Sequence, residues 1–233
     1  MTSAARTAGV VELYTSEGCS SCPSADRELS QLTRETSSGD VIPLGLHVTY
    51  WDELGWRDGL AQRIFDARQQ DLAAAHEATV IYTPQFFLNG KEIRSWRGML
   101  PALVREANAK PARVTIELTS DLGRDGTLTL EARVASRDTS MEGSLYLVVT
   151  EDALVSHVLS GENEGVTLTH DNAVRVWLGP IALVNGGVKV LRQVRLSAQW
   201  NRTHLRTVAF VQDTKDNILQ GVSASLCDVP RKG

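Results

Sequence analysis

The spacing of apolar residues divides the chain into a part that mixes strands and helices and a later part rich in strands. Residues 10–14 (VVELY) form an apolar, β-rich run, and in residues 22–34 the apolar groups Ala25, Leu29 and Leu32 are four and three apart. Spacings of three and four are typical of one face of a helix. The pattern therefore predicts a strand, a turn and a helix.

More elements follow in the same part of the chain. Residues 41–48 (VIPLGLHV) predict a second strand, and helical spacing returns in residues 61–72. Residues 85–89 and 91–96 predict two antiparallel strands around an Asn-Gly turn, and residues 99–107 predict a closing helix. The predicted order is βαβαββα.

The pattern changes after residues 108–111 (NAKP). Six short runs that alternate apolar and polar residues follow, separated by Gly, Asn and Asp turns: RVTIELT, TLTLEARVA, SLYLVVT, AVRVWL, VKVLRQVRL and RTVAFVQ. Such runs predict an antiparallel sandwich or barrel of about 120 residues. We therefore expect a flexible N-terminus over 1–9, an α/β domain over 10–110 and a β-rich domain over 111–233.

Charge and composition exclude two classes of partner. The net charge of −4 provides no broad basic surface, so we expect no nucleic acid as a partner. No stretch approaches 18 consecutive apolar residues, so we expect no membrane insertion. Three cysteines, an odd number, argue against a disulfide framework and leave Cys19 and Cys22 as a local pair, with Cys227 alone.

The pair Cys19-Ser20-Ser21-Cys22 lies where the first strand gives way to the first helix. Pro23 fits only the first turn of a helix, where its missing N–H is not needed, so it places Cys19 at the helix tip. A helix N-terminus favours a thiolate, and we expect Cys19 to be the acidic, exposed nucleophile and Cys22 the resolving thiol. Ser20 and Ser21 are small and carry hydroxyls, so we expect them at the substrate-binding surface. This chemistry needs no metal or organic cofactor.

Thr83-Pro84 directly precedes the third predicted strand. Cis peptide bonds are essentially confined to X-Pro, and we expect a cis bond here, which would place this backbone beside the cysteines to bind an extended peptide. After the second strand, Tyr50, Trp51 and Trp56 admit two interpretations. They form an aromatic wall that binds a peptide or small thiol, or they pack between domains.

Four segments together resemble a known family: GCSSCPSAD, LHVTYWDELGW, IYTPQFFLNG and GENEGVTLTHDNAVR. The first and third are similar to the thioredoxin superfamily, and all four resemble a bacterial thioredoxin-like family catalogued as a domain of unknown function and usually exported. The resemblance implies an α/β thioredoxin-like domain followed by an all-β antiparallel sandwich-like domain, and a periplasmic or secreted location. One departure is Leu13, where thioredoxins carry a buried acid; Glu12 lies on the opposite face of the strand.

We therefore predict a thiol–disulfide oxidoreductase that acts on a disulfide- or thiol-bearing protein or a small thiol. The alternative is a copper(I)- or zinc-binding protein that uses Cys19, Cys22 and His47, because thiolates and imidazole suit both metals. A pure interaction module also stays open.

The polar segment 161–175 has two interpretations as well. It packs against the first domain and helps to bind substrate, or it makes turns that cap strands. Its polar residues are Glu162, Asn163, His170, Asp171 and Asn172.

Overall fold

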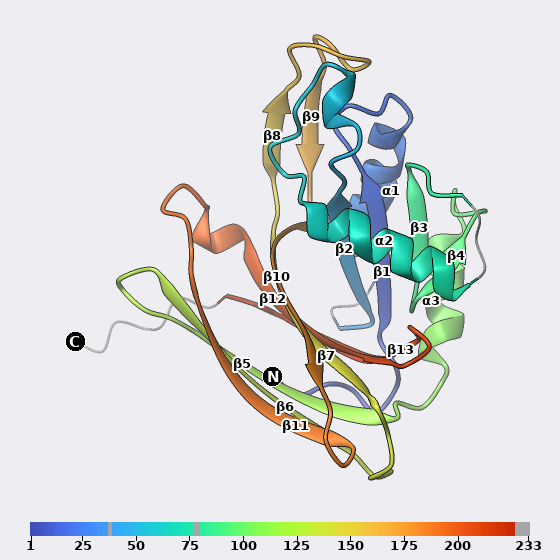
Figure 1. Cartoon of the computed structure of the whole chain (residues 1–233), viewed down its shortest axis with the longest axis vertical. Coiled ribbons are helices and arrows are strands. Elements are labelled where there is room, and N and C mark those ends of the chain that lie inside the picture. The colour runs from blue at the N-terminus through green and yellow to red at the C-terminus, as the bar shows by residue number, and fades with distance from the viewer. Residues whose placement is uncertain (37–38, 77–79, 227–233) are drawn as a thin grey trace.

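The computed structural model describes residues 1–36, 39–76 and 80–226, which form thirteen strands, three α-helices and two short 3-10 helices (Figure 1). The first half contains β1 (Gly9–Thr15), α1 (Cys22–Glu35), β2 (Val41–His47), η1 (Asp52–Leu54), α2 (Arg63–Ala75), β3 (Gln85–Leu88), β4 (Lys91–Ile93) and α3 (Leu100–Asn108). The second half contains β5 (Val114–Leu122), β6 (Thr127–Ser136), β7 (Gly143–Glu151), β8 (Leu154–His157), β9 (Thr167–His170), β10 (Ala173–Ala182), β11 (Gly187–Arg195), η2 (Arg202–His204), β12 (Leu205–Asp213) and β13 (Ile218–Ser225).

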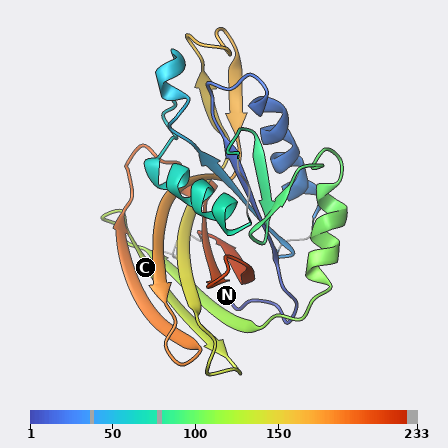
Figure 2. The ribbon, with the colours of Figure 1, turned by 45° about the vertical axis from the view of Figure 1, so that its right-hand side comes forward.

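One mixed sheet of eight strands runs through both halves of the chain, in the order β13-β12-β7-β10-β2-β1-β3-β4. Strand β10 lies parallel to β2, with Ala173 opposite Gly45, and this pairing joins the later strands to the earlier ones. Strands β11, β6 and β5 form a second, antiparallel sheet, and β8 and β9 form a separate hairpin. Figure 2 shows the three-stranded sheet curving beneath the large one.

The predicted fold class, an α/β thioredoxin-like domain followed by an all-β sandwich-like domain, is wrong. Strands expected to form a separate sandwich, β7, β10 and β12, hydrogen-bond into the same sheet as β1 and β2. Alternation along a strand indicates which side chains are buried, but it does not specify the neighbouring strand. The division into folding units at residue 110 stays a prediction, although strands from both sides of it share this sheet.

Three apolar clusters hold the layers together. Ala25, Leu29 and Leu32 of α1 are buried against β1 and α3, as their helical spacing predicts. Helix α2 packs on the opposite face of the large sheet, where Phe65 and Leu72 are buried. A third cluster fills the space between the two sheets and includes Ile116 and Leu147.

A buried ion pair links α2 to the first strand. Arg68 donates to Glu12 at 2.6 and 2.7 Å, and its guanidinium lies 4.7 Å from the ring centroid of Trp177. The Tyr14 hydroxyl also donates to Glu12. Glu12 is thus a buried polar residue satisfied by its neighbours Arg68 and Tyr14.

The N-terminal residues lie along β5. Thr2 forms an isolated bridge with Glu117 and Arg6 with Pro111. The flexibility expected of residues 1–9 stays a prediction. The amide of Gln220 donates to the carbonyls of Ala4 and Arg6. In the described part of the chain, no helix has the length and apolar character that crossing a membrane requires.

Candidate functional site

Cys19 and Cys22 form a disulfide at the start of α1, with their Cα atoms 5.4 Å apart. Pro23 lies in the first turn of the helix, as predicted. Ser20 and Ser21 are exposed, whereas both cysteines are completely buried. The prediction that Cys19 is exposed is therefore wrong, and the reason lies in a distant part of the sequence.

The loop between β8 and β9 binds the backbone of the segment that contains Cys19. Asn163 is buried, and its amide donates to the carbonyls of Glu17 (2.7 Å) and Cys19 (3.0 Å). Glu162 accepts a hydrogen bond from the backbone N–H of Ser20 at 3.0 Å. Figure 1 shows the hairpin at the same end of the molecule as the start of α1. We call residues 158–166 the cover loop.

The other polar residues of segment 161–175 form different contacts. Asp171 accepts from the backbone of Ala153 and pairs with Arg34 of α1, and the Asn172 amide donates to Thr33 of the same helix. The segment therefore packs against the first half of the chain, as one of the two interpretations expects.

The aromatic residues after β2 border the disulfide segment. The Trp51 indole donates to the Thr83 hydroxyl at 2.8 Å, and the Trp56 indole donates to Glu17 at 2.7 Å. The Thr83-Pro84 bond is cis, as predicted. Trp51 also packs against the core beside α2, so this residue combines core packing with a position beside the disulfide. Trp51 and Trp56 are half-buried.

His47, the predicted third ligand of a metal, binds a carboxylate instead. Its Nδ1 lies 2.7 Å from Asp58, and both side chains are buried. Within residues 1–36, 39–76 and 80–226, no group of three or more His, Cys, Asp and Glu side chains is arranged to hold a metal ion. The geometry of the described residues thus offers Cys19, Cys22 and His47 no shared metal position.

Four buried titratable side chains and the mostly buried Asp26 form what we call the buried cluster: Glu17, Asp26, His47, Asp58 and His170. The His170 ring lies edge-on to the His47 ring, with centroids 4.8 Å apart. Its Nε2 lies 3.3 Å from Glu17 and its Nδ1 lies 4.0 Å from Asp26. Asp26 is on α1, one turn after Cys22, so the cluster extends to the disulfide.

Burial and neighbouring charges move the pKa values of the cluster apart. Burial raises the pKa of Asp26. Burial alone would also raise the pKa of Asp58, but the His47 imidazole and two backbone N–H groups lower it to about 2. Burial lowers the pKa of His47, the Asp58 carboxylate raises it, and the net pKa is raised. Burial raises the pKa of Glu17, but hydrogen bonds from the His170 ring and the Trp56 indole lower it, and the net pKa is lowered.

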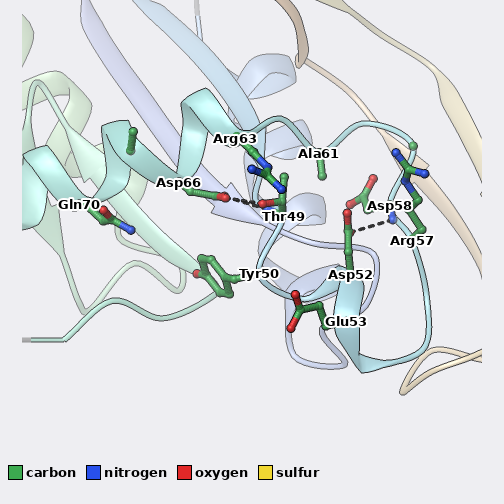
Figure 3. Close-up of a pocket in the computed structure, with 12 residues that line it drawn as sticks. Thr49, Tyr50, Asp52, Glu53, Arg57, Asp58, Ala61, Arg63, Asp66 and Gln70 are labelled. Atoms are coloured by element: carbon green, nitrogen blue, oxygen red, sulfur yellow. Dashed lines mark hydrogen bonds between the residues drawn. The ribbon is translucent and has the colours of Figure 1, made fainter.

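A polar pocket of about 1070 Å³ lies on the outer side of the loop that follows β2 (Figure 3). Asp52, Asp58 and Asp66 line it together with Arg57 and Arg63. The Asp52 carboxylate accepts from the backbone N–H of Asp58 at 3.1 Å, which stabilises the turn between these two residues. Asp58 joins this pocket to the buried cluster, since its carboxylate also contacts His47 and the backbone N–H of Glu17.

Fold and site together define a mixed β-sheet protein with a covered CxxC disulfide at a helix start. The chain belongs to the family described as protein of unknown function (DUF1223), which it matches over residues 10–212. This confirms the predicted membership of a family of unknown function. No curated protein matches the chain.

Two solved structures share the fold. A protein from Agrobacterium tumefaciens is 23% identical, with a TM-score of 0.70 over 99% of this chain and 100% of that one. HBP35 of Porphyromonas gingivalis is 15% identical, with a TM-score of 0.71 over 99% of this chain and 79% of that one. At these identities the likeness concerns the fold alone.

Sequence reasoning missed three members of the buried cluster, Glu17, Asp26 and Asp58, and noted His170 only as part of a polar loop. Asp26 carried a signal, because it follows Cys22 by four residues and adjoins the apolar face of a helix. Nothing in the sequence connects His170 to Asp26, since they are 144 positions apart.

Proposed function

We propose that this protein is a thiol–disulfide oxidoreductase in which Cys19 is the nucleophile and Cys22 the resolving thiol. The observation that carries the proposal is the Cys19–Cys22 disulfide at the N-terminus of α1, beside a buried cluster of acids and histidines. The N–H groups of a helix start favour the thiolate over the thiol. The Ser21 hydroxyl lies 3.3 Å from the Cys19 sulfur and is able to donate to that thiolate.

The exchange takes place in two displacements. The Cys19 thiolate attacks one sulfur of a substrate disulfide, forms a mixed disulfide and releases the first substrate thiolate. Cys22 then loses its proton, and its sulfur attacks Cys19, which releases the second substrate thiolate. The two cysteines are oxidised by two electrons while the substrate disulfide is reduced to two thiols. The reverse sequence oxidises a dithiol.

Both cysteines are completely buried, and Asn163 of the cover loop binds the Cys19 carbonyl, so substrate access requires a local opening, which we assign to the cover loop. The exposed Ser20 and Ser21 then border the site on one side. Trp51, which binds Thr83, borders it on the other side next to Pro84. Trp56 holds Glu17 beside the cysteines. We assign all six residues to substrate binding.

The partner is a disulfide- or thiol-bearing protein or a small thiol. A periplasmic or secreted location, which the family resemblance implies, would allow the disulfide to persist. The likeness to thioredoxins that supports the proposal is confined to the CxxC helix start and the cis Thr83-Pro84 bond. It does not extend to the fold class.

Two measurements test the proposal against a purely structural disulfide. Equilibration with glutathione gives the reduction potential of the pair, and a value above about −300 mV is expected because structural disulfides usually lie below it. The Cys22→Ser variant should accumulate mixed disulfides at Cys19, and Cys19→Ser is the matched control that should not. A reduction potential below about −300 mV, together with no mixed disulfide at Cys19 in Cys22→Ser, would refute the proposal.

A further inference from the structure

The cover loop places an acidic side chain beside the nucleophile. The Glu162 carboxylate accepts the backbone N–H of Ser20 at 3.0 Å, and Ser20 directly follows Cys19 in the chain. The Glu162 side chain is exposed, and its hydrogen bonds with Ser20 lower its pKa, so the carboxylate is ionised near neutral pH. A substrate that approaches Cys19 from this side therefore meets a negative charge.

The segments that border the disulfide contain little positive charge to offset Glu162. Residues 16–22, 50–57, 80–84 and 158–166 contain five acidic residues and one basic residue, Arg57. One of the acids, Glu164, is a second exposed carboxylate of the cover loop. Exposed charges act over a Debye length, which is about 8 Å at physiological salt, so direct contact with the substrate is not required. The charges around the disulfide thus favour a positively charged substrate.

A second set of contacts attaches the cover loop to the segment after β2. The Ser160 hydroxyl donates to the carbonyl of Gly55. A Cβ atom added to Gly161 would lie 3.3 Å from the Cβ of Trp56, so the loop backbone contacts this tryptophan. These contacts do not involve the hydrogen bonds that Asn163 donates to the cysteine segment. We therefore expect Glu162 to stay near the disulfide when the Asn163 bonds open.

The aromatic residues around the disulfide favour the same kind of substrate. Trp51 and Trp56 are half-buried, so each side chain keeps part of its surface exposed. Trp56 lies beside the cover loop next to Glu162, and Trp51 binds Thr83 on the side of the cis proline. Indole rings attract ammonium and guanidinium groups, and the combination of aromatic and acidic side chains is typical of sites that bind cations.

We propose, building on the proposed function, that Glu162 determines specificity: it selects substrates with a positive charge beside their disulfide and disfavours anionic ones such as glutathione disulfide. The ammonium or guanidinium group of the substrate pairs with the Glu162 carboxylate next to Trp56. The Cys19 thiolate attacks the nearer substrate sulfur, the substrate S–S bond breaks, and the other sulfur leaves as a thiolate that takes a proton from water. The positive charge belongs to a basic residue of a polypeptide or to a small amine thiol.

The rate at which Cys19 forms a mixed disulfide measures this selection. The full chain with Cys22→Ser and Cys227→Ser retains Cys19 as its only cysteine, and mass spectrometry follows the adduct. Three small disulfides are compared: cystamine, which carries ammonium groups, hydroxyethyl disulfide, which is uncharged, and glutathione disulfide, which is anionic. Each rate is divided by the rate of mercaptoethanol with the same disulfide, which removes differences in intrinsic reactivity.

Cystamine should react with the parent chain about tenfold faster, or more, than glutathione disulfide at low salt. A single pair of charges about 6 Å apart in water changes a rate about threefold. Glu162→Gln should therefore slow cystamine and accelerate glutathione disulfide, relative to the uncharged disulfide, and lower their ratio about tenfold. A change in the pKa of Cys19 would alter all three rates equally and leave the ratio unchanged.

Glu117→Gln is the matched control. It removes the same charge from an exposed position on β5, which lies at the opposite end of the molecule from the β8–β9 hairpin (Figure 1). The ratio of the cystamine rate to the glutathione disulfide rate should stay within about twofold of the parent. Salt is a second perturbation that needs no substitution of Glu162, because about 1 M salt shortens the Debye length to about 3 Å and should bring the parent ratio close to one.

An unchanged ratio in Glu162→Gln, or a parent ratio that does not depend on salt, would overturn the proposal. Faster reaction of glutathione disulfide than of cystamine would also overturn it, and would assign the Ser20 N–H to a substrate carboxylate that displaces Glu162. Equal reaction with all three disulfides would refute the selection alone. Failure of Cys19 to form any mixed disulfide would refute the proposed function and the selection together.

A pair of peptide disulfides distinguishes the two sources of positive charge. In one peptide lysine flanks the cysteine, and in the other glutamate does. A ratio of lysine to glutamate peptide rates that exceeds the ratio of cystamine to glutathione disulfide supports a polypeptide substrate. A smaller ratio, still above one, supports a small amine thiol, and a ratio below one would contradict the selection.

Discussion

Replacement of Asn163 by alanine should expose Cys19 without moving the disulfide segment itself. The Asn163 amide donates two hydrogen bonds, to the carbonyls of Glu17 and Cys19, and its side chain is 6% exposed. Each bond contributes about 1 kcal/mol net, so the closed cover loop should lose about 2 kcal/mol relative to the open one. Since about 1.4 kcal/mol changes an equilibrium constant tenfold, the fraction of molecules with an open cover loop should rise about 30-fold.

The assay is alkylation of reduced Cys19 by iodoacetamide, quantified by mass spectrometry of the peptide that contains it. A Cys22→Ser background prevents reformation of the disulfide. When the loop opens and closes faster than the reagent reacts, the alkylation rate follows the open fraction. We therefore expect Asn163→Ala to be modified about 30-fold faster than its parent, in proportion to the free energy lost by the closed loop.

Gln220→Ala is the matched control. Its amide is also buried and also donates to two backbone carbonyls, those of Ala4 and Arg6, but it lies on β13 and contacts no part of the cover loop. This variant should lose stability while Cys19 keeps its parental alkylation rate. The reasoning is refuted if Asn163→Ala leaves the rate within twofold of the parent, or if Gln220→Ala raises it equally.

Two further predictions concern charges around the disulfide. Glu162→Gln removes the negative charge that binds the Ser20 N–H at the start of α1, so the Cys19 thiolate should form more easily. Thiolate absorbance in a Cys22→Ser background should show a lower pKa of Cys19. An unchanged or higher pKa would contradict this prediction. The pKa of Asp58 is 3.8 in the unfolded chain and about 2 in the folded protein, so its ionised form stabilises the folded state by about 2 kcal/mol above pH 4. This stabilisation is lost as the pH falls toward 2, and Asp58→Asn removes it at every pH. Urea unfolding from pH 7 to 2 should therefore show wild type and Asp58→Asn converging in acid, and a constant difference would exclude this origin.

Local structure was largely readable from the pattern of the chain. The helix that begins at Cys22, the strand over 41–47 and the tight turn at Asn89-Gly90 all follow from apolar spacing and turn residues. Three strands were not predicted: β8 and β9, whose four residues each provide little alternation, and β13.

Strand pairing was not readable in the same way. The runs that became β7, β10 and β12 were identified as strands but assigned to a separate sandwich, whereas they extend the sheet that contains β1. A strand buried on both faces carries no mark of its neighbours, because backbone hydrogen bonds are the same for every residue except proline.

The sequence by itself determined the local features of the helix start. Two cysteines three apart, a proline in the first helical turn and a Thr-Pro before a strand are local features, and local backbone preferences are sufficient to place them. Only the tertiary structure decided whether the sulfurs are accessible and which groups surround them. Asn163 and His170 reach the disulfide segment and Asp26 from more than 140 residues away, because the large sheet brings β9 and β10 beside β2 and α1. Such contacts depend on the packing of whole elements, which no short stretch of sequence encodes.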